Sequence, residues 1–125
     1  MLPAEDVTYL KAKRLKYEET LEGGFLCVVI FGYELPAGYS QGVVDLLVCL
    51  PAGWPDTNPD MFWVDPPIAY ADGTEPGQSS GRGDYVGRTW QRFSRHVPNG
   101  VWRPGDNLET WMTMIRDILA REVKT

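Results

Sequence analysis

The stretch VCLPAGWPDTNPDMFWV, residues 48–64, decides the fold. Its two ends are apolar, and the residues between them are rich in Pro, Gly, Asp and Asn. Pro51, Pro55 and Pro59 fix the backbone and lack N–H donors, so no helix or strand can run through them. The stretch therefore predicts the end of one strand, a rigid turn and the start of the next strand.

Further strands are predicted on both sides of this turn. Residues 14–22 alternate between the two sides of an extended chain, Gly23 and Gly24 supply a turn, and an apolar run follows. This pattern predicts a hairpin. The third strand is the most apolar, which indicates a central position in the sheet, and Pro66 ends the fourth. The predicted strands cover residues 14–22, 25–35, 43–51 and 61–66, and we expect them to form a four-stranded antiparallel meander.

Two helices are predicted at the ends of the chain. Residues 4–12 favour a short helix that must pack on the sheet, because it is too short to be stable alone. Residues 106–123 show helical spacing of apolar residues, and Asp106 with Glu109 fits a capping box at the start. The apolar face comprises Leu108, Trp111, Met112, Ile115, Ile118 and Leu119. Strands followed by a helix indicate an α+β fold, an antiparallel sheet covered by a helix.

Residues 68–89 are predicted to be a long irregular loop, because five glycines interrupt them. The Arg-Gly-Asp tripeptide at 82–84 lies in this segment and is interpreted as a chance match. No repeat or composition shift divides the chain, so we expect one domain over residues 1–125.

Composition excludes several classes of function. The 125 residues carry a net charge of −5, which argues against nucleic-acid binding. No apolar run is long enough to span a membrane, and residues 1–16 lack the apolar segment of a signal peptide. We therefore expect a cytoplasmic protein. Cys27 and Cys49 each lie in an apolar run and are predicted to be buried thiols within strands.

No cofactor is predicted. The chain has a single His and no clustered Cys, which does not make a zinc site. A glycine-rich phosphate-binding motif between a strand and a helix is also missing. We therefore expect neither a metal nor a nucleotide.

Three features together resemble the ubiquitin-conjugating (E2, or UBC) fold. The first is the turn with Pro51, the pair Trp54–Pro55 and Pro59. The second is VWRPGDNLETWMTMIRDIL (101–119), where a Trp and a Pro precede the helix. The third is the meander itself. WQRFSRH (90–96) followed by WRPG (102–105) resembles prokaryotic E2 family E. This resemblance implies as partners a ubiquitin-like protein, an E1-like adenylating enzyme and a JAB-type peptidase.

The resemblance also points to Ser94 as a candidate acyl acceptor. An E2 carries its thioester cysteine about eight residues before this Trp, and eight residues before Trp102 stands Ser94. No cysteine follows Cys49. The His-Pro-Asn motif of E2 proteins is missing as well: its expected place, residues 68–71, reads IAYA. The run HVPN (96–99) has an inserted Val and follows the acceptor position, so the oxyanion role of the motif is not transferred to Asn99.

Three interpretations stay open. In the first, Ser94 accepts the C-terminus of a ubiquitin-like protein as an oxyester, with His96 as its base and Arg92 or Arg95 stabilising an oxyanion. In the second, His96 itself takes the acyl group or acts as acid and base. In the third, the domain is catalytically inactive and binds a ubiquitin-like protein or an E1-like partner. Arg92, Arg95 and Arg103 would then contact an acidic surface or a carboxylate terminus. Trp90 and Trp102 are candidates for the same partner contact, with packing that fixes this stretch as the alternative.

Overall fold

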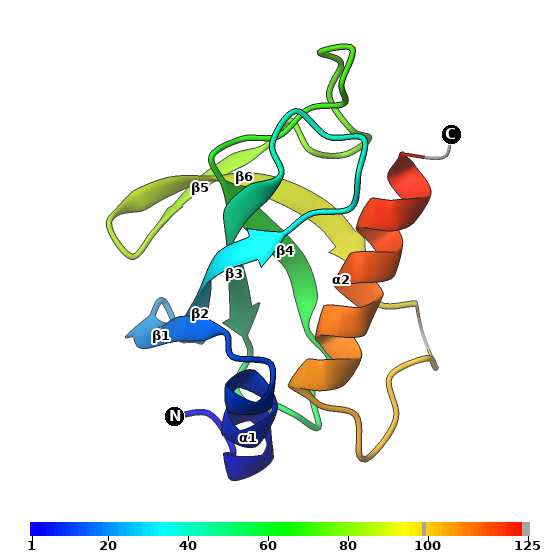
Figure 1. Cartoon of the computed structure of the whole chain (residues 1–125). Helices are drawn as coiled ribbons and strands as arrows, with labels where there is room; N and C mark the ends of the chain where they lie inside the picture. The colour runs from blue at the N-terminus through cyan, green and yellow to red at the C-terminus, as the bar shows by residue number, and fades with distance from the viewer. Residues whose placement is uncertain (99, 124–125) are drawn as a thin grey trace.

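Two helices and six strands make up the protein in the computed structural model, which describes residues 1–98 and 100–123. Figure 1 shows α2 packed across the sheet and α1 at one end of it. The elements in chain order are α1 (Ala4–Ala12), β1 (Lys16–Glu22), β2 (Phe25–Glu34), β3 (Val43–Leu50), β4 (Asp60–Asp65), β5 (Arg82–Tyr85), β6 (Arg88–His96) and α2 (Leu108–Glu122).

The strands form one antiparallel sheet with the order β1-β2-β3-β4-β6-β5. Strands β1 to β4 are the predicted meander. The sheet curls strongly, because its two ends are joined by a contact between distant segments. The N–H of Val86, in the turn between β5 and β6, donates to both carboxylate oxygens of Glu22 at 3.2 Å. Glu22 is the last residue of the opposite edge strand, β1.

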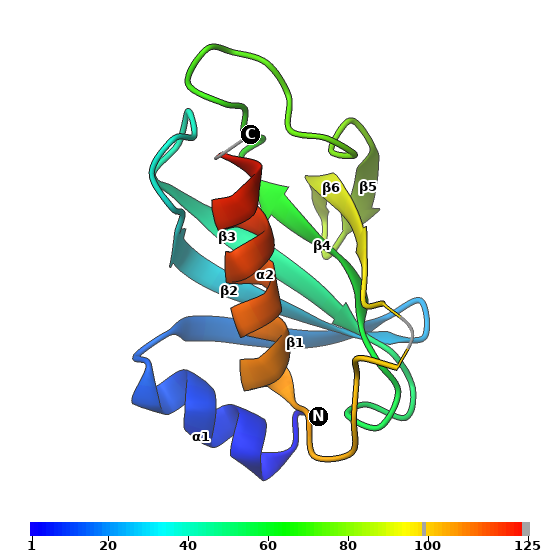
Figure 2. The same cartoon turned by 90° about the vertical axis from the view of Figure 1, so that its right-hand side faces the viewer.

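The curl gives the sheet two buried faces, and each has its own core. Figure 2 shows α2 lying across one face of the sheet. The first core fills the space between them, and α2 turns its apolar face toward it. The second lies on the other face of the sheet, and Phe31, Tyr85 and Val86 partly cover it. Helix α2 supplies Leu108, Trp111, Met112, Ile115 and Leu119 to the first core. The second consists of Cys27, Val29, Leu47, Cys49, Trp63 and Trp90.

The prediction of four strands was wrong, since the structure has six. Strand β5 and the first residues of β6 lie within residues 68–89, which were predicted to be irregular throughout. Their sequence lacks an apolar alternation, because Gly83 takes a position where a side chain would normally pack. Pairing with β4 and burial of Trp90 hold this hairpin in place, and neither is visible in a local pattern.

The segment that remains irregular, residues 68–81, is held by one buried side chain. The amide of Gln91 is 1% exposed and makes three hydrogen bonds. Its oxygen accepts from the N–H of Ile68 at 2.7 Å, and its nitrogen donates to the carbonyls of Ile68 at 3.0 Å and Ser79 at 3.2 Å. A buried amide with all these partners fixes the chain that it contacts.

Both predicted helices are confirmed, and only the cap of α2 differs. Helix α1 has the predicted bounds, and the apolar face of α2 is buried as predicted except for the half-buried Ile118. The capping box is made by Asn107 and Thr110, not by Asp106 and Glu109. The carboxylate of Asp106 accepts instead from the N–H of Arg103 at 2.8 Å, which closes the turn before the helix.

We predict that Gly83→Ala destabilises the protein. A Cβ at this position would stand 2.6 Å from Cζ3 of Trp63, whose ring is 6% exposed and cannot move freely. Overpacking of this kind costs about 1–3 kcal/mol, and urea unfolding should show that loss. Gly42→Ala is the matched control, because its Cβ would meet nothing within 4 Å. Equal stability of the two variants would contradict this account of the β5 packing.

Candidate functional site

The stretch that carries the candidate residues is a strand and not a loop. Residues 90–96 belong to β6, between β4 and β5. The pairing with β4 breaks within it: Phe93 pairs with Phe62 and His96 with Asp60, so two residues of β6 stand opposite one of β4. The two are Ser94 and Arg95. A β-bulge of this kind disrupts the ladder locally and is common beside active sites.

Ser94 lies at this bulge with a free hydroxyl. The residue is half-buried, and its backbone N–H donates to the carbonyl of Gln78 at 3.0 Å, outside the β4 ladder. No hydrogen bond reaches its Oγ within residues 1–98 and 100–123. Met61, opposite the bulge, has a left-handed backbone with φ of 59°. Such strained positions cluster at functional sites.

His96 is held by a carboxylate that the sequence did not reveal. Its Nδ1 contacts Oδ1 of Asp60, the first residue of β4, and both side chains are largely exposed. This contact leaves Nε2 directed away from Asp60 and able to exchange a proton. Among the described residues, the structure does not join His96 to Ser94 by a hydrogen bond.

The three arginines do not form one cluster. Arg95 donates to the carbonyl of Gly77 at 2.9 Å and pairs with Glu122 of α2, which ties β6 to the helix. The guanidinium of Arg92 lies directly over Gly81, so a Cβ there would stand 2.7 Å from Nη2. Arg103 lies in the turn before α2 and is exposed. Only Arg92 and Arg95 therefore belong to the surroundings of Ser94.

Both tryptophans pack within the fold, and the prediction that Trp90 contacts a partner was wrong, because its side chain is 0% exposed. Trp90 is fully buried in the second core, its Nε1–H donates to the carbonyl of Tyr85 at 3.0 Å, and Arg88 covers its ring at 4.4 Å. Trp102 lies 5.5 Å from Trp54, centroid to centroid, and donates to the carbonyl of Pro55 at 2.8 Å. Trp102 therefore fastens the segment before α2 to the proline turn that follows β3.

A buried carboxylate completes this junction. Asp6 of α1 is 1% exposed, and each of its oxygens accepts one hydrogen bond. Oδ2 accepts from Nε1–H of Trp54 at 2.9 Å, and Oδ1 accepts from the N–H of Leu108 at 3.1 Å. Leu108 is the first residue of α2, so Asp6 serves as a second cap for that helix and is favoured there by the helix dipole.

The sequence comparison agrees with this arrangement. The family described as prokaryotic E2 family E matches residues 2–122. The chain belongs to prokaryotic E2 family E. No curated protein and no solved structure matches the chain. An E2-like role in ubiquitin-like conjugation follows, and in general it implies a ubiquitin-like protein and an E1-like partner.

The cysteines of this E2-like protein are not candidates for a thioester. Cys27 and Cys49 face each other across β2 and β3 as free, buried thiols, with sulfurs 3.8 Å apart. Burial raises the pKa of both thiols, so little thiolate is present at neutral pH. The prediction of buried strand thiols is confirmed. The part of the chain that the structure describes also contains no helix long and apolar enough to cross a membrane.

Sequence reasoning missed Asp60, Gln91 and Asp6. Asp60 and His96 are 36 residues apart and meet only because β4 pairs with β6, a pairing that was not predicted. Gln91 looked like an ordinary polar strand residue. The one usable signal was Asp6, an acidic residue in the first turn of a helix expected to pack on its neighbours. Asn99, the last residue of the HVPN run, lies outside the described residues.

We predict that Asp6→Asn destabilises the E2-like domain by about 2–3 kcal/mol in urea unfolding. The amide keeps the shape of the carboxylate but sets an NH₂ donor against one of two N–H donors, and it removes the charge from both hydrogen bonds. Glu5→Gln is the matched control, because Glu5 is exposed in the same helical turn. If both variants lose the same stability, Asp6 does not have the role assigned to it.

Proposed function

We propose that this protein is a carrier in a bacterial ubiquitin-like conjugation pathway and holds its passenger as an oxyester on Ser94. One observation carries the proposal: a serine with an unpartnered hydroxyl stands at a β-bulge, two residues before a histidine that a carboxylate holds. Nucleophile, base and a third residue orienting the base are the parts that a hydroxyl acceptor needs. Family membership supports the acyl-transfer chemistry.

The transfer step exchanges one acyl bond for another. Oγ of Ser94 attacks the activated C-terminal carbonyl carbon of the ubiquitin-like protein on its E1-like donor, and a new C–O bond forms. The bond to the donor's leaving group breaks. The hydroxyl proton passes to Nε2 of His96 and from there to the leaving group, while Asp60 stabilises the imidazolium. The hydrogen bond between Ser94 and His96 forms when the acyl donor is bound, as catalytic contacts commonly do.

Arg92 is proposed to stabilise the oxyanion of this step. Among the described residues no hydrogen bond or ion pair engages its guanidinium, which therefore keeps donor capacity for a ligand beside Ser94. Arg95 is less suited, because it already donates to Gly77 and Glu122. An acyl group on His96 itself is the weaker choice, since an acyl-imidazole hydrolyses quickly and Nδ1 is engaged by Asp60.

A second candidate function is a catalytically inactive module that binds a ubiquitin-like protein or an E1-like enzyme. The observation in its favour is that the Ser94 segment is fixed as part of the sheet. Ser94 donates its N–H to Gln78, and Arg95 anchors the next residue to both Gly77 and α2. A carrier loop that must enter another enzyme's active site would gain from more freedom.

The wider setting belongs to the same proposal. The protein acts in the cytoplasm as one domain over residues 1–125, without a cofactor. A JAB-type peptidase works in the same pathway and releases the passenger. The calculated net charge of −5 supports protein partners over nucleic acid.

The decisive experiment is an adduct assay with the E1-like enzyme and the ubiquitin-like protein encoded near its gene, together with ATP. We predict a covalent adduct that survives thiol reductant, breaks in hydroxide and is absent in Ser94→Ala. Ser80→Ala is the matched control, because Ser80 is an exposed serine of the preceding segment. His96→Gln should lower the rate of adduct formation by about 10²–10⁴-fold, the range for a general base, and Asp60→Asn should lower it less.

The outcomes separate the candidates. If no adduct forms but the protein still binds the ubiquitin-like protein, the carrier function is wrong and the inactive module is supported. An adduct that dissolves in reductant and maps to Cys27 or Cys49 would contradict both the oxyester and the buried state of these thiols. Normal adduct formation in Ser94→Ala that is lost in His96→Gln would move the acyl acceptor to the histidine.

A further inference from the structure

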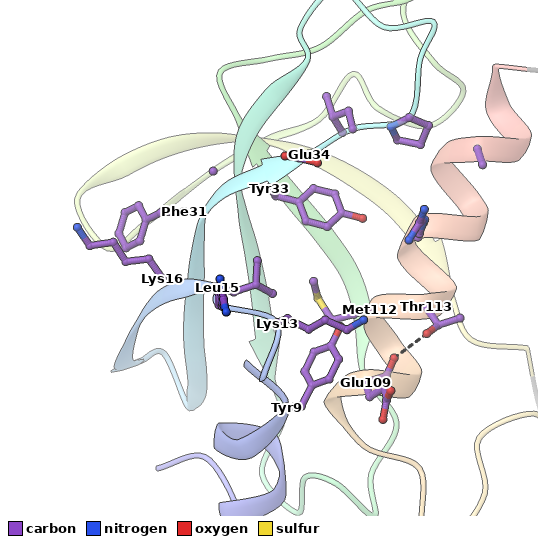
Figure 3. A pocket seen from close by; sticks show the side chains of 16 residues that line it. Tyr9, Lys13, Leu15, Lys16, Phe31, Tyr33, Glu34, Glu109, Met112 and Thr113 are labelled. Carbon is purple, nitrogen blue, oxygen red and sulfur yellow. Dashed lines mark hydrogen bonds between the residues drawn. The ribbon is translucent and has the colours of Figure 1, made fainter. Parts of the chain in front are cut away.

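A second concave site lies on the other flank of α2, away from β6. It is a cavity of about 770 Å³ between the C-terminal end of α1, the start of β1, the end of β2 and the middle of α2. Figure 3 shows Tyr33 reaching from β2 toward α2, with Tyr9 and Lys13 from the α1 side and Glu109 and Met112 from the helix. The chemistry proposed for Ser94 uses none of these residues.

A β-bulge directs Tyr33 into this cavity. Ile30 pairs with Leu46 and Tyr33 with Val44, so β2 has one extra residue in this interval. Gly32, with φ of 67°, supplies the left-handed conformation that the bulge needs. Without the extra residue Tyr33 would face the opposite side of the sheet from Ile30; with it, both residues lie in the core under α2.

The ring of Tyr33 is packed in the core, and its hydroxyl is left to face the cavity. The residue is 9% exposed, and no hydrogen bond reaches its hydroxyl within the described part of the chain. Burial raises the pKa of Tyr33 to about 12, with Arg116 acting in the opposite direction. The phenol therefore stays protonated and can donate. Tyr9 lines the same cavity. Burial and Glu109 raise its pKa, and Arg116 only partly opposes this rise.

The charge of the cavity opposes that of the protein. Its lining includes four cationic and two anionic side chains, although the whole chain carries a net charge of −5. None of the four cations has an ion-pair partner among residues 1–98 and 100–123. The cations are Lys13, Arg14, Lys16 and Arg116, and the anions are Glu34 and Glu109.

We propose that this cavity binds an acidic peptide segment of a partner protein, with one carboxylate held by Arg116 and the hydroxyls of Tyr33 and Tyr9. Arg116, Tyr33 and Tyr9 line the cavity from α2, β2 and α1, and guanidinium and phenol groups are donors that suit a carboxylate. Leu15, Leu35 and Met112 give the cavity an apolar part that suits an adjoining side chain. Lys13 and Lys16 at its border suit further acidic residues of the same segment.

A phosphate group fits this site less well than a carboxylate. Glu109 lines the cavity as well, and its carboxylate repels a phosphate dianion more strongly than a single carboxylate. The lining spans four secondary-structure elements and leaves the cavity open to solvent, as an extended chain needs. A peptide can also reach the separate cations, which a small anion cannot do at once.

The test uses the full chain and a fluorescein-labelled peptide, Asp-Glu-Phe-Asp-Leu-Glu, in fluorescence polarisation at low ionic strength. We predict saturable binding that weakens with added salt, and no binding of the neutral analogue Asn-Gln-Phe-Asn-Leu-Gln. Arg116→Gln should raise the Kd about tenfold or more, as expected for a charge-assisted hydrogen bond, and Tyr33→Phe about fivefold. Arg121→Gln is the matched control, an exposed arginine of α2 outside the cavity.

Several results would overturn the proposal. They are equal binding of the neutral peptide, an equal effect of Arg116→Gln and Arg121→Gln, or binding of succinate as tight as that of the acidic peptide. Should Arg116→Gln lower the melting temperature, Lys13→Gln at the exposed border gives the same comparison. Ser94→Ala should bind the peptide like the unchanged protein, so failure of the oxyester would leave this inference untouched.

Discussion

The buried carboxylate of Asp6 holds together the three segments that define this fold. It joins α1 to the proline turn through Trp54 and to the first N–H of α2 through Leu108. Trp102, whose ring contacts that of Trp54 at a tilt, adds the segment that leads from β6 into α2. An unpaired carboxylate at this depth would cost several kcal/mol, so its two donors must be in place together. Helix α2 is thereby positioned by α1 at one end of the sequence and by the segment that directly precedes α2.

The curl of the sheet holds β6, and with it Ser94, in a fixed position. Glu22 at one end of the sheet accepts from the β5–β6 turn at the other, and the second core fills the space between. With Trp90 and Trp63 buried there, β6 cannot detach as a free loop without exposing two large aromatic rings. The chemistry proposed for Ser94 would therefore take place on a strand, where a partner approaches a fixed hydroxyl.

The sequence predicted the parts of the fold that leave a local pattern. The proline turn, the hairpin of β1 and β2 and the apolar face of α2 all follow from spacing and turn residues, and the structure has them. The hairpin of β5 and β6 leaves no such pattern, because Gly83 and a run of polar residues replace the apolar alternation and the hairpin also depends on distant partners in β4. Leu21 shows the same limit: its alternation predicted burial, but it is 76% exposed at the edge of the sheet. The Asp60–His96 contact could not be predicted, because it depends on the unpredicted pairing of β4 with β6.

The two places where the ladders lose register coincide with the two proposed sites of this small sheet. A regular β2 would turn Tyr33 away from α2, and the cavity would lack its hydroxyl. A regular β6 would set Ser94 alone opposite Met61 of β4; instead Ser94 and Arg95 together stand opposite that one residue. Each extra residue interrupts ladder pairing and weakens the sheet locally, a cost that the two cores on either face offset. The register shifts thus connect sequence to function more directly than the strands that contain them, because each one sets the position of a polar group that no part of the fold itself requires.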